Sequence, residues 1–391
     1  MPKPKASSVE SDALRRWKLR GASSPLLDAR LKFMEVEGVA RYVRFMGDLP
    51  CHVCGFNEKM HNPNVALACP QYSPRVFPNF LPTQASGRWS TTNPPMTNFP
   101  PDCVAPTCTL AGTEHGCVTS QCWSAREVVG PDEGTYWVHF DLDGIEARWA
   151  AADSGDQDDL QAFRNGWDLH TITACRAYNL PLPPVLTKLL HTDLSCEPWR
   201  NLWVPPWSGA EDRRRHIIKT MRYATLYGIS SKGVLQAKGI EKLGLKPEEL
   251  VAFATRYLRS KPALIARKRQ VWDDCAKTGV SYTWFGRRRR LYGDWNTRAK
   301  EGWSHRISGT VTDYMNQALI AITDHFPECH LVLNSHDGAT IAFPLATDLT
   351  TVLLFSRGQV EREVTSPTGH IVPVTASWEQ ITSDLVRHGL Q

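Results

Sequence analysis

Two cations and two aromatic residues recur at every fourth position between residues 215 and 227, and this spacing constrains the local fold more than any other feature of the chain. The four residues are Arg215, Lys219, Tyr223 and Tyr227. A helix has 3.6 residues per turn, so four-residue steps drift slowly around its axis and place all four side chains on one face. Arg and Lys neutralise phosphate oxygens, and an aromatic ring further along can meet a base or sugar. The pattern therefore predicts a helix that binds a nucleoside triphosphate, and the alternative is a solvated basic face.

Two other segments combine apolar runs with carboxylates, one before this helix and one after it. Residues 135–148 predict a strand that ends at an acidic turn containing Asp141 and passes into a helix. Residues 330–343 are two apolar runs around the polar tip His336-Asp337, which is a hairpin pattern. Phosphoryl transfer with two metal ions needs two carboxylates that are distant in sequence and close in space, because Mg²⁺ prefers oxygen ligands. A single strand-end carboxylate is most often a surface residue, so the order of all three segments carries the prediction.

These segments resemble motifs of DNA polymerase family A, the group of bacterial DNA polymerase I. Residues 215–228 match the fingers motif Arg-x3-Lys-x6/7-Tyr-Gly, and residues 141–148 match the metal motif Asp-x3-Ile-Glu-x-Arg. His336-Asp337 resemble the second metal motif, which usually reads His-Asp-Glu. Residues 165–171 resemble a motif whose histidine, here His170, would meet the incoming phosphates. Residues 86–100 resemble the segment that contacts the minor groove of the primer-template, here through Arg88 and Asn98.

The resemblance implies an α+β chain with the right-hand polymerase fold, in which an antiparallel sheet forms the palm, helices form the fingers and the thumb is reduced. The expected parts are a reduced thumb with a candidate zinc segment at 1–85, the first part of the palm at 86–150 with a Cys-rich insertion at 101–125, the fingers at 151–301 and the second part of the palm at 302–391. Within the last part we expect a helix over 347–364, then a strand and a helix to Gln391. About 85 residues before the first motif are too few for a full thumb or an exonuclease, so a minimal form that lacks the exonuclease domains is expected.

The resemblance also implies roles for individual residues. Asp141, Asp337 and Lys219 would be catalytic, with the two aspartates holding two Mg²⁺ ions that Mn²⁺ can replace. The triphosphate, sugar and base would be bound by Arg215, Lys219, Tyr223, Tyr227, His170 and Glu146. The DNA would be contacted by Arg88, Asn98, Ser308 and His336. Glu146 would crowd the 2′ position of the sugar and so exclude ribonucleotides, and Tyr223, in place of phenylalanine, predicts tolerance of dideoxynucleotides.

Two positions depart from the family pattern. Gly338 stands where the family has an acidic residue after the second metal aspartate, and Ser308 stands where it has glutamine. Both departures put efficient extension in doubt. Asp143 is two residues beyond Asp141, so if the strand continues the two side chains share one face, and Asp143 becomes a candidate metal ligand that replaces the missing charge. The alternative for Asp143 is a solvated turn residue.

The chain has 11 cysteines, and all of those before residue 130 fall into two clusters. Since the sequence begins without a signal-peptide core, thiols or metal ligands are favoured over disulfides. The first candidate zinc site is Cys51, Cys54, His61 and Cys69, and the second is Cys103, Cys108, Cys117 and Cys122, where His115 could replace one cysteine. Four such ligands suit a structural tetrahedral Zn²⁺, and the alternative is free buried thiols.

A formal net charge of +5, gathered in short arginine clusters, suits nucleic acid, and no apolar run reaches membrane-spanning length. We expect an intracellular, template-directed DNA polymerase without proofreading, whose partners are primer-template DNA, deoxynucleoside triphosphates and a processivity or replication protein, with no membrane. One alternative is a weak or inactive polymerase relic that binds primed nucleic acid as a scaffold. A further alternative is an enzyme that makes primers from ribonucleotides.

Overall fold

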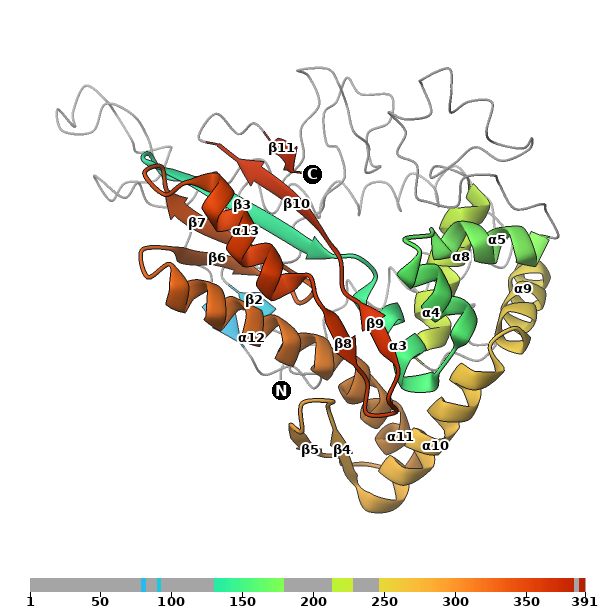
Figure 1. The fold of residues 1–391 in the computed structure, drawn as a ribbon. Coiled ribbons are helices and arrows are strands. Elements are labelled where there is room, and N and C mark those ends of the chain that lie inside the picture. Colours follow the sequence, from blue (N-terminus) through green and yellow to red (C-terminus); the bar gives the residue numbers. More distant parts are fainter. Residues whose placement is uncertain are drawn as a thin grey trace, which may run out of the picture. The chain divides into compact units, whose positions relative to one another are not determined.

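The computed structural model describes residues 79–81, 90–92, 130–178, 213–227, 246–382 and 387–390, and its elements are shown in Figure 1. The chain divides into two compact units. Among the described residues, one unit holds Leu142–Leu319 and Leu354–Ala376, and the other holds the residues up to Asp141, Ile320–Leu353 and those from Ser377 onward. The domain boundaries expected from the sequence stay predictions.

A five-stranded sheet lies in the second of these units, in the order β11-β10-β3-β7-β6. Its strands are β3 (Thr135–Leu142), β6 (His330–Asn334), β7 (Gly338–Pro344), β10 (Ala376–Ile381) and β11 (Arg387–Leu390). The pairs β3·β7, β6·β7 and β10·β11 are antiparallel. The expected α+β class and antiparallel sheet are therefore confirmed.

Buried and partly exposed side chains alternate along β3, and the buried ones pack into the core of the sheet. Tyr136, Val138 and Phe140 are buried, while the residues between them are partly exposed, as a period of two requires. The Phe140 ring lies 4.9 Å from that of Trp378, and the Tyr136 ring lies 5.8 Å from that of Phe343. Strand β7 lies between two neighbours and is buried over nearly its whole length, which is typical of a central strand.

The other unit is mainly helical. Its helices are α3 (Ile145–Ser154), α4 (Gln157–Arg164), α5 (Leu169–Tyr178), α8 (Arg213–Leu226), α9 (Pro247–Arg259), α10 (Pro262–Thr278) and α11 (Trp295–Ser304). Proline at the first position of α9 and α10, and the carboxylates of Asp156 and Asp294 before α4 and α11, begin four of them. A π-helical turn, η6 (His305–Gly309), joins α11 to α12 (Thr310–His325). In the part of the chain that the structure describes, no helix is both long and apolar enough to cross a membrane.

Short strands account for three differences from the expected elements. The hairpin of β4 (Val280–Tyr282) and β5 (Arg288–Arg290) interrupts the segment expected to be helical, because Gly286 has a φ of 85° and closes a turn. The expected helix over 347–364 ends earlier, as α13 (Leu349–Val360), since Val364 and Thr365 pair in β8 (Glu363–Thr365) with β9 (Ile371–Pro373). The expected C-terminal helix is wrong in residues 387–390, which form β11 on β10. A last pair, β1 (Asn79–Leu81) with β2 (Ser90–Thr92), is antiparallel.

Candidate active site

The two predicted metal aspartates lie on neighbouring strands. Asp141 is the last residue but one of β3 and pairs with Gly338, the first residue of β7, so Asp337 immediately precedes its strand partner. The side chain of Asp141 is exposed and that of Asp337 is half-buried. We call Asp141, His336, Asp337 and Gly338 the carboxylate hairpin. The sequence prediction that two distant carboxylates come together is thus reproduced by the strand register.

A tight turn closes the tip of the carboxylate hairpin. The backbone N–H of Ser335 donates to the carbonyl of Gly338 at 2.8 Å, and the N–H of His336 donates to Oδ1 of Asn334 at 3.2 Å. His336 has a φ of 85° and is the one non-glycine residue of the described part of the chain in the left-handed region. Such a conformation costs on the order of 1–3 kcal/mol and persists only where the surrounding structure fixes it. The bonds at Ser335 and His336 are that fixation, and they define where Asp337 emerges.

Close contacts with β3 explain why position 338 is a glycine. A Cβ at this position would lie 2.7 Å from the carbonyl oxygen of Phe140 and 2.9 Å from Oδ1 of Asp141. Packed side chains do not approach so closely, so any larger residue would require the strands to separate. This close approach gives a steric reason for glycine, and not an acidic residue, at position 338.

The donor set of the carboxylate hairpin fits divalent cations such as Mg²⁺. In the described part of the chain no three His, Cys, Asp or Glu side chains gather as a metal site, so the protein offers two carboxylates here. Mg²⁺ commonly takes one or two carboxylates and fills its other positions with water and substrate phosphate. Two carboxylates, one exposed and one half-buried, are sufficient for that mode of binding.

The expected placement of Asp143 is not found. Strand β3 ends at Leu142, so Asp143 lies in the turn before α3 and does not share a strand face with Asp141. Its N–H donates to the carbonyl of Thr375 at 2.9 Å, and its Oδ2 accepts from the Thr375 hydroxyl at 3.0 Å. The premise for charge compensation was therefore wrong, because these bonds turn the chain away from the strand direction.

Helix α8 carries the basic and aromatic stripe, and its burial pattern agrees with the predicted face. Ile218, Met221 and Arg222 are buried, whereas Lys219 is exposed and Tyr223 is half-buried. Arg215 lies in the first turn of α8, and its side chain is outside the described residues. Tyr227 follows the last helical residue, and its N–H donates to the Tyr223 carbonyl at 3.4 Å. The helix predicted from the spacing is therefore confirmed, while the nucleotide-binding roles stay predictions.

His170 comes close to this helix from α5. Asp168 precedes α5 and accepts from the N–H of His170 at 3.3 Å and from the hydroxyl of Thr171 at 2.5 Å, which holds the start of the helix. The centroids of the His170 and Tyr223 rings are 6.5 Å apart, with the planes tilted by 47°. The structure thus brings together two of the predicted nucleotide-binding residues.

Glu146, Ser308 and Tyr227 form one hydrogen-bonded group, which we call the hydroxyl relay. The Ser308 hydroxyl donates to Oε1 of Glu146 at 2.9 Å, and the Tyr227 hydroxyl lies 2.8 Å from Ser308 Oγ. Glu146 is 6% exposed and Ser308 is 2% exposed. Three predicted site residues from α3, η6 and the end of α8 therefore meet, a contact that no local sequence pattern indicates.

Arg148 of the metal motif has a structural role. Its guanidinium donates to the carbonyls of Asp143 and Pro373 and to the hydroxyl of Thr375, each at 2.7 Å, and lies 4.6 Å from the centre of the Phe163 ring. Burial lowers the pKa of Arg148 to about 10, although the charge of Asp143 acts in the opposite direction. These bonds fix the turn at Asp143 and hence the start of α3, the helix that carries Glu146.

A buried charge cluster lies behind α8, and sequence analysis missed it. Arg222 donates to Oδ2 of Asp159 at 3.0 Å, and Nζ of Lys261 lies 2.5 Å from Oδ1 of Asp159 and 3.1 Å from Oδ2 of Asp156. The side chains of Arg222, Asp159 and Lys261 are each about 95% buried. Burial would raise the pKa of Asp159, but the neighbouring Arg222 and Lys261 hold it below its usual value. The cluster joins α4, α8 and the start of α10, and so fixes the position of the helix that carries Lys219.

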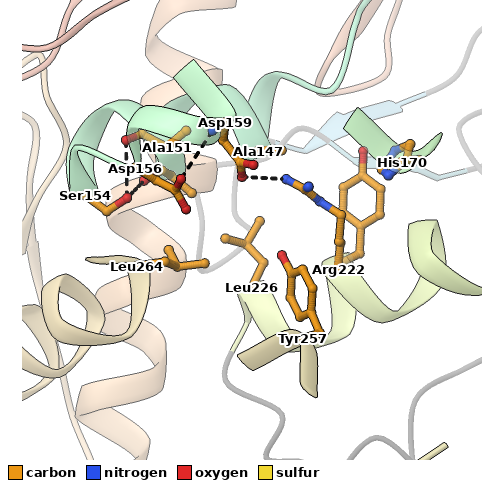
Figure 2. Close-up of a pocket in the computed structure, with 12 residues that line it drawn as sticks. Ala147, Ala151, Ser154, Asp156, Asp159, His170, Arg222, Leu226, Tyr257 and Leu264 are labelled. Atoms are coloured by element: carbon orange, nitrogen blue, oxygen red, sulfur yellow. Dashed lines mark hydrogen bonds and ion pairs between the residues drawn. The ribbon is translucent and has the colours of Figure 1, made fainter. Parts of the chain in front are cut away.

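A small cavity of about 20 Å³ adjoins this cluster, room for roughly one water molecule. Figure 2 shows Asp159 and Arg222 pointing toward one another on one side of it, with Leu226, Leu264 and Tyr257 on the other. His170 also lines it. Its size excludes a nucleotide, so we assign it to the packing of the helices.

Several predicted residues lie outside the described part of the chain. They are the DNA contacts Arg88 and Asn98, the cysteine and histidine residues of both candidate zinc sites, and the segment expected to form the thumb except for residues 79–81. Zinc binding and these contacts stay predictions. The missed charge cluster left no local signal, because Arg222 is three residues after Lys219 and so lies within about 60° of it around the helix axis.

Comparisons with known proteins agree with this geometry. The sequence profile described as DNA polymerase family A matches residues 58–189. The thermostable DNA polymerase I of Thermus thermophilus is 27% identical over 231 residues, which cover 56% of this chain and 24% of that protein. The DNA polymerase I of Chloroflexus aurantiacus is 26% identical over 263 residues, which cover 65% of this chain and 23% of that protein. The chain thus spans about a quarter of the length of the curated relatives it matches.

A solved structure extends the likeness to nearly the whole chain. It is the POL domain of Pol1 from M. smegmatis in complex with DNA primer-template and dNTP, with a TM-score of 0.62 and 20% sequence identity, covering 95% of this chain and 55% of that one. The fold is accordingly that of a DNA polymerase domain. The profile match and the curated relatives support the resemblance to DNA polymerase family A, and the solved structure supports the fold.

Proposed function

We propose that this protein is a template-directed DNA polymerase that adds deoxynucleotides to a primer 3′ end, without proofreading. The observation that carries the proposal is the register of β3 and β7, which makes neighbours of Asp141 and Asp337 at one end of the sheet. The resemblance to DNA polymerase family A supports the same activity. By analogy with the related POL domain bound to primer-template and dNTP, the partners are primed DNA and deoxynucleoside triphosphates.

The protein residues would act mainly by position and charge. Asp141 and Asp337 would hold two Mg²⁺ ions, which supply an activated primer hydroxyl and neutralise the triphosphate. Lys219, exposed on α8, would bind the triphosphate and protonate the pyrophosphate leaving group, with Arg215 and His170 as further phosphate contacts. Such preorganised charges lower the barrier because they need no rearrangement during the reaction.

Other residues of the proposed site would select the sugar and base of the incoming nucleotide. Tyr223, half-buried on α8 and next to His170, would lie against the sugar and base, and Tyr227 would guard the template side. Glu146, buried and hydrogen-bonded, would crowd the 2′ position and so reject ribonucleotides. Arg88 and Asn98 would contact the primer-template, with His336 in a secondary contact, whereas the buried Ser308 hydroxyl bonds within the protein.

Primer extension tests the proposal. A recessed DNA template with deoxynucleotides and Mg²⁺ is compared for the wild type, Asp141→Asn and Asp337→Asn, with Asp324→Asn as the matched control, since Asp324 is an exposed carboxylate on α12 of the same unit. We expect each site variant to lose at least about a hundredfold in extension rate and the control to keep the wild-type rate. Undiminished extension by either site variant would refute the assignment.

One observation favours a second candidate, an inactive relic that binds primed nucleic acid. Gly338 leaves the carboxylate hairpin with one acidic residue fewer than the family pattern. Under this candidate the wild type binds primed DNA with an affinity that falls steeply with salt, but extends nothing. Ribonucleotide use is tested separately with Glu146→Ala, which should admit ribonucleotides only if Glu146 excludes them in the wild type.

A further inference from the structure

Ser308 lies in an unusual stretch of backbone. It is the fourth residue of the π-helical turn η6, which interrupts an otherwise continuous run of helix from α11 to α12. A π-turn inserts one residue and shifts the side chains beyond it around the helix surface, and such turns occur often at functional sites. The Ser308 side chain is thereby buried to 98%, so its hydroxyl needs partners within the protein.

Each hydroxyl has one proton to donate, and this determines which group donates in each hydrogen bond of the hydroxyl relay. Ser308 has one hydroxyl proton, which it donates to Oε1 of Glu146. The contact between Tyr227 and Ser308 must then use the tyrosine proton, with Ser308 Oγ as the acceptor. Tyr227 therefore donates to Ser308, and Ser308 donates to Glu146. Chains of this kind polarise along their length, so loss of the middle member breaks both bonds at once.

Both ends of the relay are anchored by other contacts. Next to Tyr227, the last carbonyls of α8 accept from Lys268 Nζ at Thr225 and from Trp303 Nε1 at Leu226, each at 2.7 Å. At the other end, Glu146 is in the first turn of α3, whose start Arg148 holds through Asp143. Ser308 thus connects Tyr227 to Glu146 within the relay, and its hydrogen bond to Oε1 helps to hold the Glu146 carboxyl in place.

We propose that Ser308 is a positioning residue for sugar selection, holding Glu146 against the 2′ position of the incoming nucleotide through the hydroxyl relay. The inference rests on the proposed function, because it assigns to Ser308 a part in the discrimination attributed to Glu146. It also gives the departure at position 308 a role, since the serine is 2% exposed and its hydroxyl bonds to two side chains of the protein.

The test compares kcat/KM for a matched deoxynucleotide and ribonucleotide. Ser308→Ala should lower the ratio about tenfold, the equivalent of about 1.4 kcal/mol for a hydrogen bond to a charged group, with the change mainly in the KM of the ribonucleotide. Ser356→Ala is the matched control, because Ser356 is 1% exposed and its hydroxyl has no hydrogen bond within the described chain. The control should keep the wild-type ratio.

A double-mutant cycle separates positioning from a general structural effect. If Ser308 acts through Glu146, Ser308→Ala should not change the ratio further in a Glu146→Ala background. The same tenfold change in both backgrounds would overturn the inference, and so would a wild-type ratio in folded Ser308→Ala. If Ser308→Ala does not fold, Tyr227→Phe removes only the outer bond and should lower the ratio about threefold, and an unchanged ratio would overturn the inference. A wild type that extends no primer at all refutes the proposed function itself.

Discussion

Replacing Asp159 by asparagine tests whether the buried charge cluster holds the fold behind α8. Asp159 accepts from Lys261 at 2.5 Å and from Arg222 at 3.0 Å, and its side chain is 6% exposed. Asparagine has nearly the same shape, so the change removes the charge with little change in volume. Arg222 would then lose its carboxylate, while Lys261 would keep Asp156 at 3.1 Å.

The magnitude follows from these partners. Removing one member of a buried ion pair costs roughly 3–5 kcal/mol, because the remaining charge stays buried without compensation. Since Asp156 still compensates Lys261, we expect the lower end, about 3 kcal/mol less free energy of unfolding. The neighbouring Asp158 provides a matched control. It pairs with Arg176 at 3.0 Å, but the two side chains are 65% and 57% exposed, so Asp158→Asn should cost at most about 1 kcal/mol.

Urea unfolding at pH 7.5, followed by circular dichroism, measures both variants against the wild type. The pH dependence of this stabilisation gives a second check. Because the folded pKa of Asp159 is lowered, its stabilisation is present above the unfolded value near about 4 and is lost as the pH falls below it. The difference between wild type and Asp159→Asn should therefore shrink in acid. Equal destabilisation by Asp159→Asn and Asp158→Asn would refute the reasoning.

Three other predictions concern the sites. Gly338→Glu, which restores the acidic residue of the family, should lower stability by about 1–3 kcal/mol and leave extension no faster, because a Cβ would lie 2.7 Å from the Phe140 carbonyl; faster extension with an unchanged melting temperature would contradict this. Burial, with Arg287 and Arg289 nearby, lowers the pKa of His305 to about 4, so the unfolded state binds its proton first as the pH falls. Between pH 7 and pH 5 the wild type should lose about 2 kcal/mol more than His305→Gln, as denaturant titrations at both values would show. Tyr223 predicts ready incorporation of dideoxynucleotides, and discrimination above about a hundredfold, some 2.7 kcal/mol, in a termination assay would contradict it.

Local periodicity predicted the elements that carry the candidate site. Helix α8 follows from the four-residue spacing of its cations and aromatics, and in the structure Lys219 of that stripe is exposed while the apolar Ile218 is buried. The alternation in β3 and the polar tip between β6 and β7 likewise predicted strands that bring Asp141 to Asp337. These signals are local, because the period of a helix or strand repeats within a few residues.

Contacts between distant segments left no such signal. Asp159 is 63 residues from Arg222 and 102 residues from Lys261, so no window of sequence shows their pairing. The strand β11 depends on its partner β10 more than on its own four residues, Arg387–Leu390. The π-turn at Ser308 differs from an α-helix by one inserted residue, which has no characteristic composition.

The two departures from the family pattern bear on the choice between an active enzyme and a relic. At an abandoned site, substitutions are expected to leave voids or unsatisfied polar groups, because nothing selects against them. Instead, Gly338 occupies a position where the Phe140 carbonyl and the Asp141 carboxylate leave no room for a Cβ. Ser308 fills its buried position with two hydrogen bonds, to Glu146 and Tyr227. Each departure is thus matched by the structure around it, and both keep a predicted catalytic or selecting carboxylate in place. This matching is the reason to expect extension from the wild type, with the relic as the outcome to be tested against it.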